Sequence, residues 1–434
     1  MREQRIAFRQ RYQRCWFCCK HALNVPGAQR VLVLPKPLLV CPFFVLSLLL
    51  FLIMVFGLTT VDFQDLVIGW TRPLWGYTDK PTFAYELPYF EFESPAATCV
   101  QMGWRARDLE HDGKLFDTFI FSTELDLLEI RLRELDQVVD VWVLVESDRT
   151  HTNRPKELWW ESKGRFEPRF RPYLDRIESV VVRSSEMEER FQRRTGPFGL
   201  EALQRRAIMQ GLHARGLKSG DVFITGDVDE IPRRGTASLL KHCDLFPPDL
   251  TLHMPTTIGG FQFISYEEDK RHTKARTYWS ERRHAQWTSH HRTIGHTLLL
   301  NAGWHCSWCF PYLSLFRFKM EAGVHSDRSN PNKKSDKYVS DVTLNERLCR
   351  GEPPLEREYE RPESYTFTDV MRRWRDKLDV EGRRRHRNDS HVLSSLPLAL
   401  QESPNKFSFL MPGGECQRSV GIGGNLILDR SDTV

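Results

Sequence analysis

The chain has 434 residues, of which 40% are hydrophobic and 27% charged, with a formal net charge of +5 at pH 7. Residues 1–36 hold eight Lys or Arg against a single Glu, a local charge of +7, so the rest of the chain is slightly acidic. The basic balance belongs to a short tail, where attraction to anionic lipid explains it. We therefore expect no nucleic-acid partner.

The tail is followed by 25 residues, 37–61, without a charged side chain. A bilayer core needs about 20 apolar helical residues, so this run predicts a transmembrane helix. The alternative is a cleaved signal peptide, whose apolar core is usually shorter, about 7–15 residues. The positive charge ahead of the run predicts a retained signal anchor with residues 1–36 in the cytosol and the remainder translocated.

Three further segments are expected after this anchor. Residues 62–111 are rich in Pro, aromatic and acidic side chains without periodicity, which predicts a stem, although a cap packed on the following domain is the alternative. Residues 112–418 are sufficient for a luminal domain with a full core, or for two small ones. Residues 419–434 are glycine-rich and predict a flexible C-terminal tail.

The domain begins with an alternation of strand and helix patterns. Residues 115–121 (LFDTFIF) predict a strand, and leucines at helical spacing predict a helix over 125–135. Thr123 and Asp126 are placed as a capping box for this helix. Residues 138–145 (VVDVWVLV) predict the second strand, which leads into Glu-Ser-Asp.

The alternation continues with a third strand over 177–182 and a helix that carries apolar residues over 200–212 and ends at Gly216. The fourth strand lies in DVFITGDVDEIP, residues 221–232. Strands that alternate with crossover helices predict an α/β fold, in which a mostly parallel sheet has helices on both faces.

The fourth strand delivers Asp227 and Asp229 into a turn closed by Pro232. Ligands of open α/β sheets lie at the carboxyl ends of strands, and paired carboxylates there suit Mg²⁺ or Mn²⁺ bridging the phosphates of a nucleotide. An acidic surface turn is the alternative. Glu230 either orients this loop or is a solvated turn residue.

The motif at residues 302–310 (AGWHCSWCF) contains the one CxxC of the expected luminal domain. Such a pair serves as a redox couple, half of a zinc site or a structural disulfide. Structural disulfides are expected, with the pairing open, because an even number of cysteines faces an oxidising compartment: Cys99, Cys243, Cys306, Cys309, Cys349 and Cys416. His305 either completes the metal shell or contacts a diphosphate, or it is a packed histidine between two tryptophans.

Four blocks carry a resemblance to a known family: FDTFIF through VLVES, DVFITGDVDEIP, NAGWHCSWCF and KFSFLMPGGECQR. Together they resemble glycosyltransferase family 17, the β-1,4-mannosyl-glycoprotein 4-β-N-acetylglucosaminyltransferases, and the plant-type members in particular. The resemblance covers about residues 113–418. It implies a GT-A-like nucleotide-sugar-binding sheet with flanking helices, UDP-N-acetylglucosamine as donor, a divalent metal, an N-glycan acceptor on glycoproteins, and a Golgi type II membrane anchor.

An inverting transfer of N-acetylglucosamine to a mannose needs a base for the acceptor hydroxyl and compensation for the charge of the leaving diphosphate. Asp227 and Asp229 are the expected metal and donor site, with His305 beside them. Glu146, at the end of the second strand, and Asp327 are the candidates for the base, and the sequence does not choose between them. Two arginines of the preceding helix, 205 and 206, could reach the diphosphate.

Five tryptophans supply flat faces for sugar rings, of which one or two are expected to contact glycan: Trp159, Trp160, Trp279, Trp287 and Trp308. Asn388 begins a glycosylation sequon. Two functions from other classes remain as alternatives. One is a membrane-anchored thiol-disulfide protein that uses Cys306 and Cys309, and the other is a non-catalytic glycan-binding module on the same fold.

Overall fold

The computed structural model describes residues 85–87, 95–108, 113–186, 196–265, 273–280, 297–323, 340–354, 364–366 and 396–421. The chain divides into two compact units, Met1–Trp70 and Thr71–Val434, and every described residue belongs to the second. The expected cytosolic tail and the anchor over 37–61 therefore lie outside the described residues. Within the described part of the chain, no helix combines the length and the apolar character needed to cross a bilayer.

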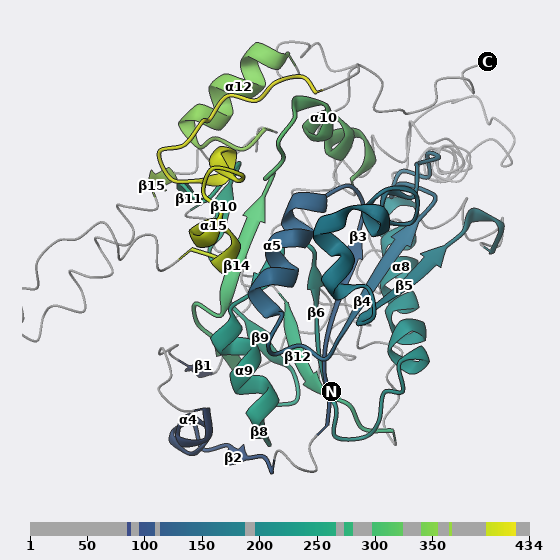
Figure 1. Ribbon diagram of the computed structural model, residues 1–434, viewed down its shortest axis with the longest axis vertical. Coiled ribbons are helices and arrows are strands. Elements are labelled where there is room, and N and C mark those ends of the chain that lie inside the picture. The colour runs from purple at the N-terminus through teal and green to yellow at the C-terminus, as the bar shows by residue number, and fades with distance from the viewer. Residues whose placement is uncertain are drawn as a thin grey trace, which may run out of the picture. The chain divides into compact units, whose positions relative to one another are not determined.

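A mixed sheet of eight strands forms the centre of the fold (Figure 1). Its β12 alone runs against the other strands, which are parallel to one another. The mostly parallel α/β sheet expected from the sequence is thereby confirmed. In spatial order the strands are β1 (Tyr85–Leu87), β13 (Thr297–Leu299), β9 (Leu250–Leu252), β12 (Lys274–Thr277), β6 (Val222–Asp227), β3 (Leu115–Phe121), β4 (Val141–Ser147) and β5 (Ile177–Val182).

Helices cover both faces of this sheet because neighbouring residues of each strand point to opposite sides. On one face, α5 (Leu125–Leu135) and α9 (Arg234–His242) pack their leucines in one core cluster with Leu144. On the other, α8 (Gly196–Ala214) packs with Val143 in a second cluster. The other helices of the described residues are α4 (Pro95–Gln101), α6 (Trp159–Ser162), α10 (Leu313–Ala322), α12 (Asp341–Arg350), α15 (Leu398–Glu402), and the 3₁₀ turns η3 (Gly164–Phe166), η4 (Pro168–Tyr173), η5 (Ser184–Glu186) and η8 (Ser408–Leu410).

A second sheet begins where β6 ends. Only Val228 and Asp229 separate β6 from β7, the edge strand that pairs antiparallel with β14. The order in this sheet is β15 (Ser364–Thr366), β11 (Phe263–Ser265), β10 (Thr256–Ile258), β14 (Gly303–Ser307) and β7 (Glu230–Pro232). Two short strands, β2 (Arg105–Ala106) and β8 (Cys243–Asp244), form a third sheet. The expected proline-closed turn is therefore partly wrong, since Pro232 lies in an edge strand, where its missing N–H costs nothing.

The local predictions succeed for β3, α5 and β5, whose bounds match the expected ranges. The second strand begins three residues later than expected, because the amides of Val138 and Val139 bond back to the carbonyl of Leu135 and close α5. The capping box is wrong: α5 has no side-chain cap, and the carboxylate of Glu124 accepts from the amides of Ser122 and Thr123 instead.

Parts of the expected stem pack onto the domain. Strand β1 pairs with β13 of the central sheet, and α4 is joined to β8 by the Cys99–Cys243 disulfide. The expected boundary at residue 112 therefore does not separate these segments from the domain, as the alternative of a packed cap implies. The six cysteines of the expected luminal part all form disulfides, as expected, and the other pairs are Cys306–Cys309 and Cys349–Cys416.

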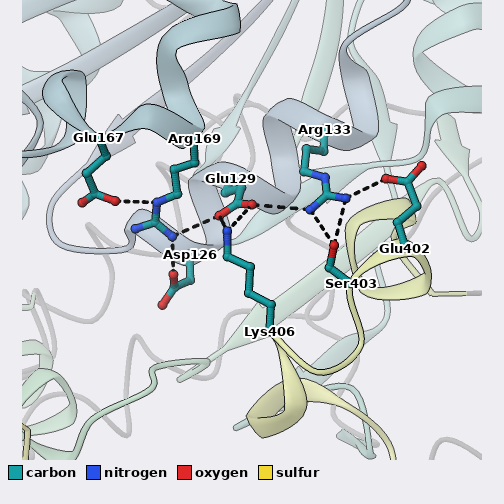
Figure 2. Close-up of polar contacts among 8 residues, drawn as sticks. All are labelled: Asp126, Glu129, Arg133, Glu167, Arg169, Glu402, Ser403 and Lys406. Carbon is teal, nitrogen blue, oxygen red and sulfur yellow. Dashed lines mark hydrogen bonds and ion pairs between the residues drawn. The ribbon is translucent and has the colours of Figure 1, made fainter.

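The C-terminal segment 396–421 returns to the front of α5. Figure 2 shows its side chains meeting those of α5 in a network of ion pairs, in which Lys406 bonds to Glu129 and Arg133 bonds to Glu402. At the start of the expected flexible tail, the carbonyl of Ser419 accepts from Leu313. Residues 422–434 lie outside the described residues.

Candidate functional site

A buried guanidinium binds the backbone of the turn that carries the paired aspartates. Nη1 of Arg131, on α5, donates to the carbonyl oxygens of Asp227 and Glu230 at 2.7 and 2.6 Å. The other nitrogens of Arg131 bind both carboxylate oxygens of Asp117, on β3, at 2.6 and 2.7 Å. Both side chains of this pair are fully buried. Sequence analysis missed the pair, although a charged residue in each of two apolar patterns was the available signal.

Glu230 braces the same turn from the other side. Its Oε2 accepts from the amide of Asp227 at 3.1 Å and from the hydroxyl of Thr273 at 2.8 Å. Gly226 is required here, because a Cβ on it would lie 2.1 Å from the Thr273 hydroxyl and 2.8 Å from Glu230 Oε2. These contacts support the loop-orienting interpretation of Glu230.

Asp227 lies at the end of β6 beside basic side chains of α8. Its Oδ1 accepts from Nη2 of Arg205 at 2.8 Å, and Arg205 also binds Glu201. Burial alone lowers the pKa of Arg205, but the two carboxylates outweigh it and raise that pKa. His151 bonds Gln204 at 3.2 Å, and burial lowers the pKa of His151, so its ring is neutral at neutral pH. Arg205 therefore lies beside the aspartate pair, and its contact with a diphosphate stays a prediction.

Asp229 lies two residues further along the same turn, where its carboxylate faces α10 and β14. Its Oδ2 accepts from Nζ of Lys319 at 3.0 Å. Nε2 of His305 lies 3.9 Å from Oδ1 of Asp229, and the other ring nitrogen is 3.2 Å from the hydroxyl of Thr256. The structure therefore brings His305 next to the aspartate pair, as expected. It also adds Lys319, which sequence analysis missed because a helical pattern does not show which carboxylate a lysine reaches.

The donor atoms at this turn fit a divalent cation that is shared with a substrate. Within the described residues, no group of three or more His, Cys, Asp or Glu could hold a metal by itself. Magnesium and manganese are commonly bound by one or two carboxylates together with substrate phosphates, which is what Asp227 and Asp229 offer.

The two candidates for the base have different outcomes. Glu146 is buried at the end of β4, and its carboxylate accepts from the amides of Trp160 and Glu161 at the start of α6 and from Lys156 at 3.4 Å. Burial raises the pKa of Glu146. These contacts favour a structural role, and its role as a base stays a hypothesis. Asp327 lies outside the described residues.

The tryptophans proposed for sugar stacking differ in their exposure. Trp160 is buried in the core, and Trp308 stacks on a phenylalanine of α10 with ring centroids 6.2 Å apart. Trp279 is the most exposed of the described candidates. Trp287 and Asn388 lie outside the described residues.

The position of the CxxC disulfide disfavours a redox function. The amide of Cys306 bonds to the carbonyl of Asp229 at 2.8 Å, so this cysteine belongs to the frame of the site. Both Cys306 and Cys309 are buried. Because thiol-disulfide exchange needs access to a sulfur, this pair is placed as a structural bridge.

Comparison with known proteins identifies relatives. A model of glycosyltransferase family 17 matches residues 38–419. The β-1,4-mannosyl-glycoprotein 4-β-N-acetylglucosaminyltransferase of Rattus norvegicus is 29% identical over 247 residues, which are 49% of this chain and 43% of that protein. The Homo sapiens protein of the same name is 29% identical over 237 residues, 47% of this chain and 42% of that protein. The matches thus span less than half the length of these curated relatives.

Proposed function

Because this chain belongs to glycosyltransferase family 17, we propose that it transfers N-acetylglucosamine from UDP-N-acetylglucosamine to a mannose of a glycoprotein N-glycan, with inversion. The observation that carries the proposal is the aspartate pair, 227 and 229, which Arg131 and Glu230 fix at the carboxyl end of β6. The names of the relatives support the sugar and the acceptor.

The chemistry follows from the charges at this turn. A glycosyl transition state resembles an oxocarbenium ion, and the departing diphosphate gathers negative charge. A divalent cation held by Asp227 and Asp229 would supply the main compensation for that charge. Arg205 and Lys319 add positive charge beside the same two carboxylates. Glu146 and Asp327 remain the candidates for the base that takes the proton of the acceptor hydroxyl.

We place this reaction in the Golgi lumen, with residues 37–61 as a single type II membrane anchor. The uncharged run of 25 residues and the basic tail ahead of it support this topology. Three disulfides in the described domain are also consistent with an oxidising compartment.

The test uses the full-length chain in detergent with a panel of UDP-sugars, Mn²⁺ and defined N-glycans, followed by mass spectrometry. We expect a mass gain of one N-acetylhexosamine from UDP-N-acetylglucosamine and its loss on addition of a chelator. Asp229→Asn should lower the transfer rate by a factor of roughly 10²–10³ while the unfolding temperature stays close to that of the wild type.

Two other results would contradict the proposal. Full transfer by Asp229→Asn would remove the aspartate pair from the mechanism. Retained binding of N-glycans without transfer from any UDP-sugar would instead support the glycan-binding module.

A further inference from the structure

The charge of the aspartate pair is balanced by two protein cations. Arg205 lies 2.8 Å from Asp227, and Lys319 lies 3.0 Å from Asp229. Each aspartate of the turn thus has one protein cation within hydrogen-bond distance. Arg205 and Lys319 therefore bind the same carboxylates that a divalent metal would need as ligands.

The two cations differ in how firmly they are held. Arg205 is 4% exposed and is bound to a second carboxylate, Glu201. Lys319 has a 30% exposed side chain and donates to Asp229 alone among the hydrogen bonds that the described residues show for it. A flexible ammonium with three donors is also easier to redirect than a planar guanidinium fixed at both ends. Lys319 is therefore the side chain that can move.

Aromatic rings and acidic neighbours keep Lys319 near the site. Its ammonium lies 5.6 Å from the ring centroid of Trp308 and 5.4 Å from that of Phe310. The nearest acidic neighbour of this ammonium is the carboxylate of Asp229, 3.0 Å away. The rings allow the head group to shift while the stem remains packed.

A divalent cation on Asp229 would repel an ammonium 3.0 Å from the same carboxylate. We propose that Lys319 is the counter-ion of Asp229 in the donor-free protein and moves onto the diphosphate of the nucleotide sugar when metal and donor bind. This inference rests on the proposed function and adds a residue to it. Lys319 then opposes metal binding without nucleotide and favours binding of the metal–nucleotide pair.

The experiment measures two affinities of the full-length chain in detergent, for Mn²⁺ alone by electron paramagnetic resonance and for UDP with saturating Mn²⁺ by calorimetry. Lys319→Met keeps an apolar stem against the rings and removes the charge. We expect Mn²⁺ alone to bind about tenfold more tightly and UDP about tenfold more weakly, since a charged hydrogen bond is exchanged in each case. Lys319→Arg should restore most of the UDP affinity.

Lys406→Met is the matched control. The ammonium of Lys406 lies 2.5 Å from a carboxylate oxygen of Glu129 and 5.4 Å from the ring of Phe407, and its side chain is 43% exposed, but it belongs to the network of Figure 2 on the front of α5. Both affinities should stay at the wild-type values. If Lys319→Met does not fold, Lys319→Gln replaces it.

The outcomes separate this inference from the proposed function. Tighter binding of Mn²⁺ alone together with weaker binding of UDP by Lys319→Met supports the exchange, and the reverse pair of shifts contradicts it. Sugar transfer by the wild type, with either affinity of the Lys319 variant unchanged or both shifted the same way, would overturn the exchange alone. A wild-type chain that binds no UDP in the presence of Mn²⁺ would overturn both.

Discussion

Lys274 is a buried lysine in the central sheet, close to the strand that carries Asp227. It lies on β12 between β6 and β9 and is 2% exposed, and within the described residues the one hydrogen bond of its ammonium goes to the hydroxyl of Thr251 at 2.6 Å. Burial and the charge of Arg276 lower the pKa of Lys274 to about 8, against the smaller opposing effects of Asp249 and Glu230.

We predict that Lys274→Met stabilises the protein at pH 7. The folded-state pKa is below the ordinary value of 10.5, so the folded state prefers the neutral amine and protonation below about pH 8 costs stability. This shift corresponds to roughly 3 kcal/mol, from which the lost hydrogen bond to Thr251 removes about 1 kcal/mol. The net gain at pH 7 should be about 2 kcal/mol.

Denaturant unfolding between pH 7 and 10.5 checks this prediction. The advantage of Lys274→Met should shrink as the pH rises from 8 to 10.5, because the wild-type amine then becomes neutral in both states. Lys163→Met, at an exposed ion pair with Glu157, is the control and should change stability by less than about 0.5 kcal/mol. A variant less stable than wild type at pH 7 would contradict the argument.

The limits of sequence prediction also appear at single residues. Asp227 and Asp229 could be assigned to one turn because two carboxylates one residue apart at the end of an apolar run are a local pattern. Lys319 could not be paired with Asp229, since 90 residues separate them and the contact depends on how α10 packs. Asp117 and Arg131 are 14 residues apart, but their ion pair also depends on tertiary packing, here of α5 against β3.

At the level of elements, the local sequence pattern predicted helices and strands that have a clear apolar periodicity. It failed for short strands that form only because they pair with a distant strand. Helix α5 and strand β3 match their predicted ranges. Strand β7 has three residues, ends in Pro232, and is a strand only because it pairs with β14, some 70 residues later in the chain. The second sheet, which supplies His305 to the site, could therefore not be predicted from local sequence.

Arg131 connects α5 and β3 to the aspartate turn. Substitutions of Arg131 and Asp117 should therefore change the free energy of unfolding and the affinity for UDP by different amounts. Arg131→Met leaves Asp117 as an unpaired buried carboxylate and should cost about 3–5 kcal/mol of unfolding free energy. Adding Asp117→Leu should recover much of this loss, because the buried charge is gone. The double variant should still bind UDP with Mn²⁺ at least tenfold more weakly, because the carbonyls of Asp227 and Glu230 lose their common donor.

Thermal unfolding and calorimetry of the single and double variants check this separation. Recovery of UDP affinity together with stability would show that the turn keeps its shape without the guanidinium. Arg133→Met, on the same helix but in the network of Figure 2, serves as a control that should leave UDP affinity unchanged.

On the scale of the molecule, the last described segment completes the core behind the site. Leu396, Ala399, Leu400, Phe407 and Leu410 share a buried cluster with side chains of α5, β7 and β14. Arg418 is buried and donates to the carbonyls of Phe310, Gly259, Phe409 and Glu415, which ties the segment to β10 and to the start of α10. Residues 396–418 and the strands of the site therefore belong to one packing unit.

This packing predicts that a core substitution in residues 396–421, far from the aspartates in sequence, destabilises the whole domain. Phe407 is fully buried in the cluster with Ile231 and Trp304, so Phe407→Ala should cost about 3–5 kcal/mol. Because β7 and β14 lose support together, we expect one unfolding transition, shifted to lower denaturant, with hydrogen exchange accelerated in β3 as well as β14. Phe166→Ala, at a 72% exposed side chain, should change stability by less than about 0.5 kcal/mol. An early transition confined to residues 396–421, with exchange in β3 unchanged, would show instead that this segment is an independent flap over the site.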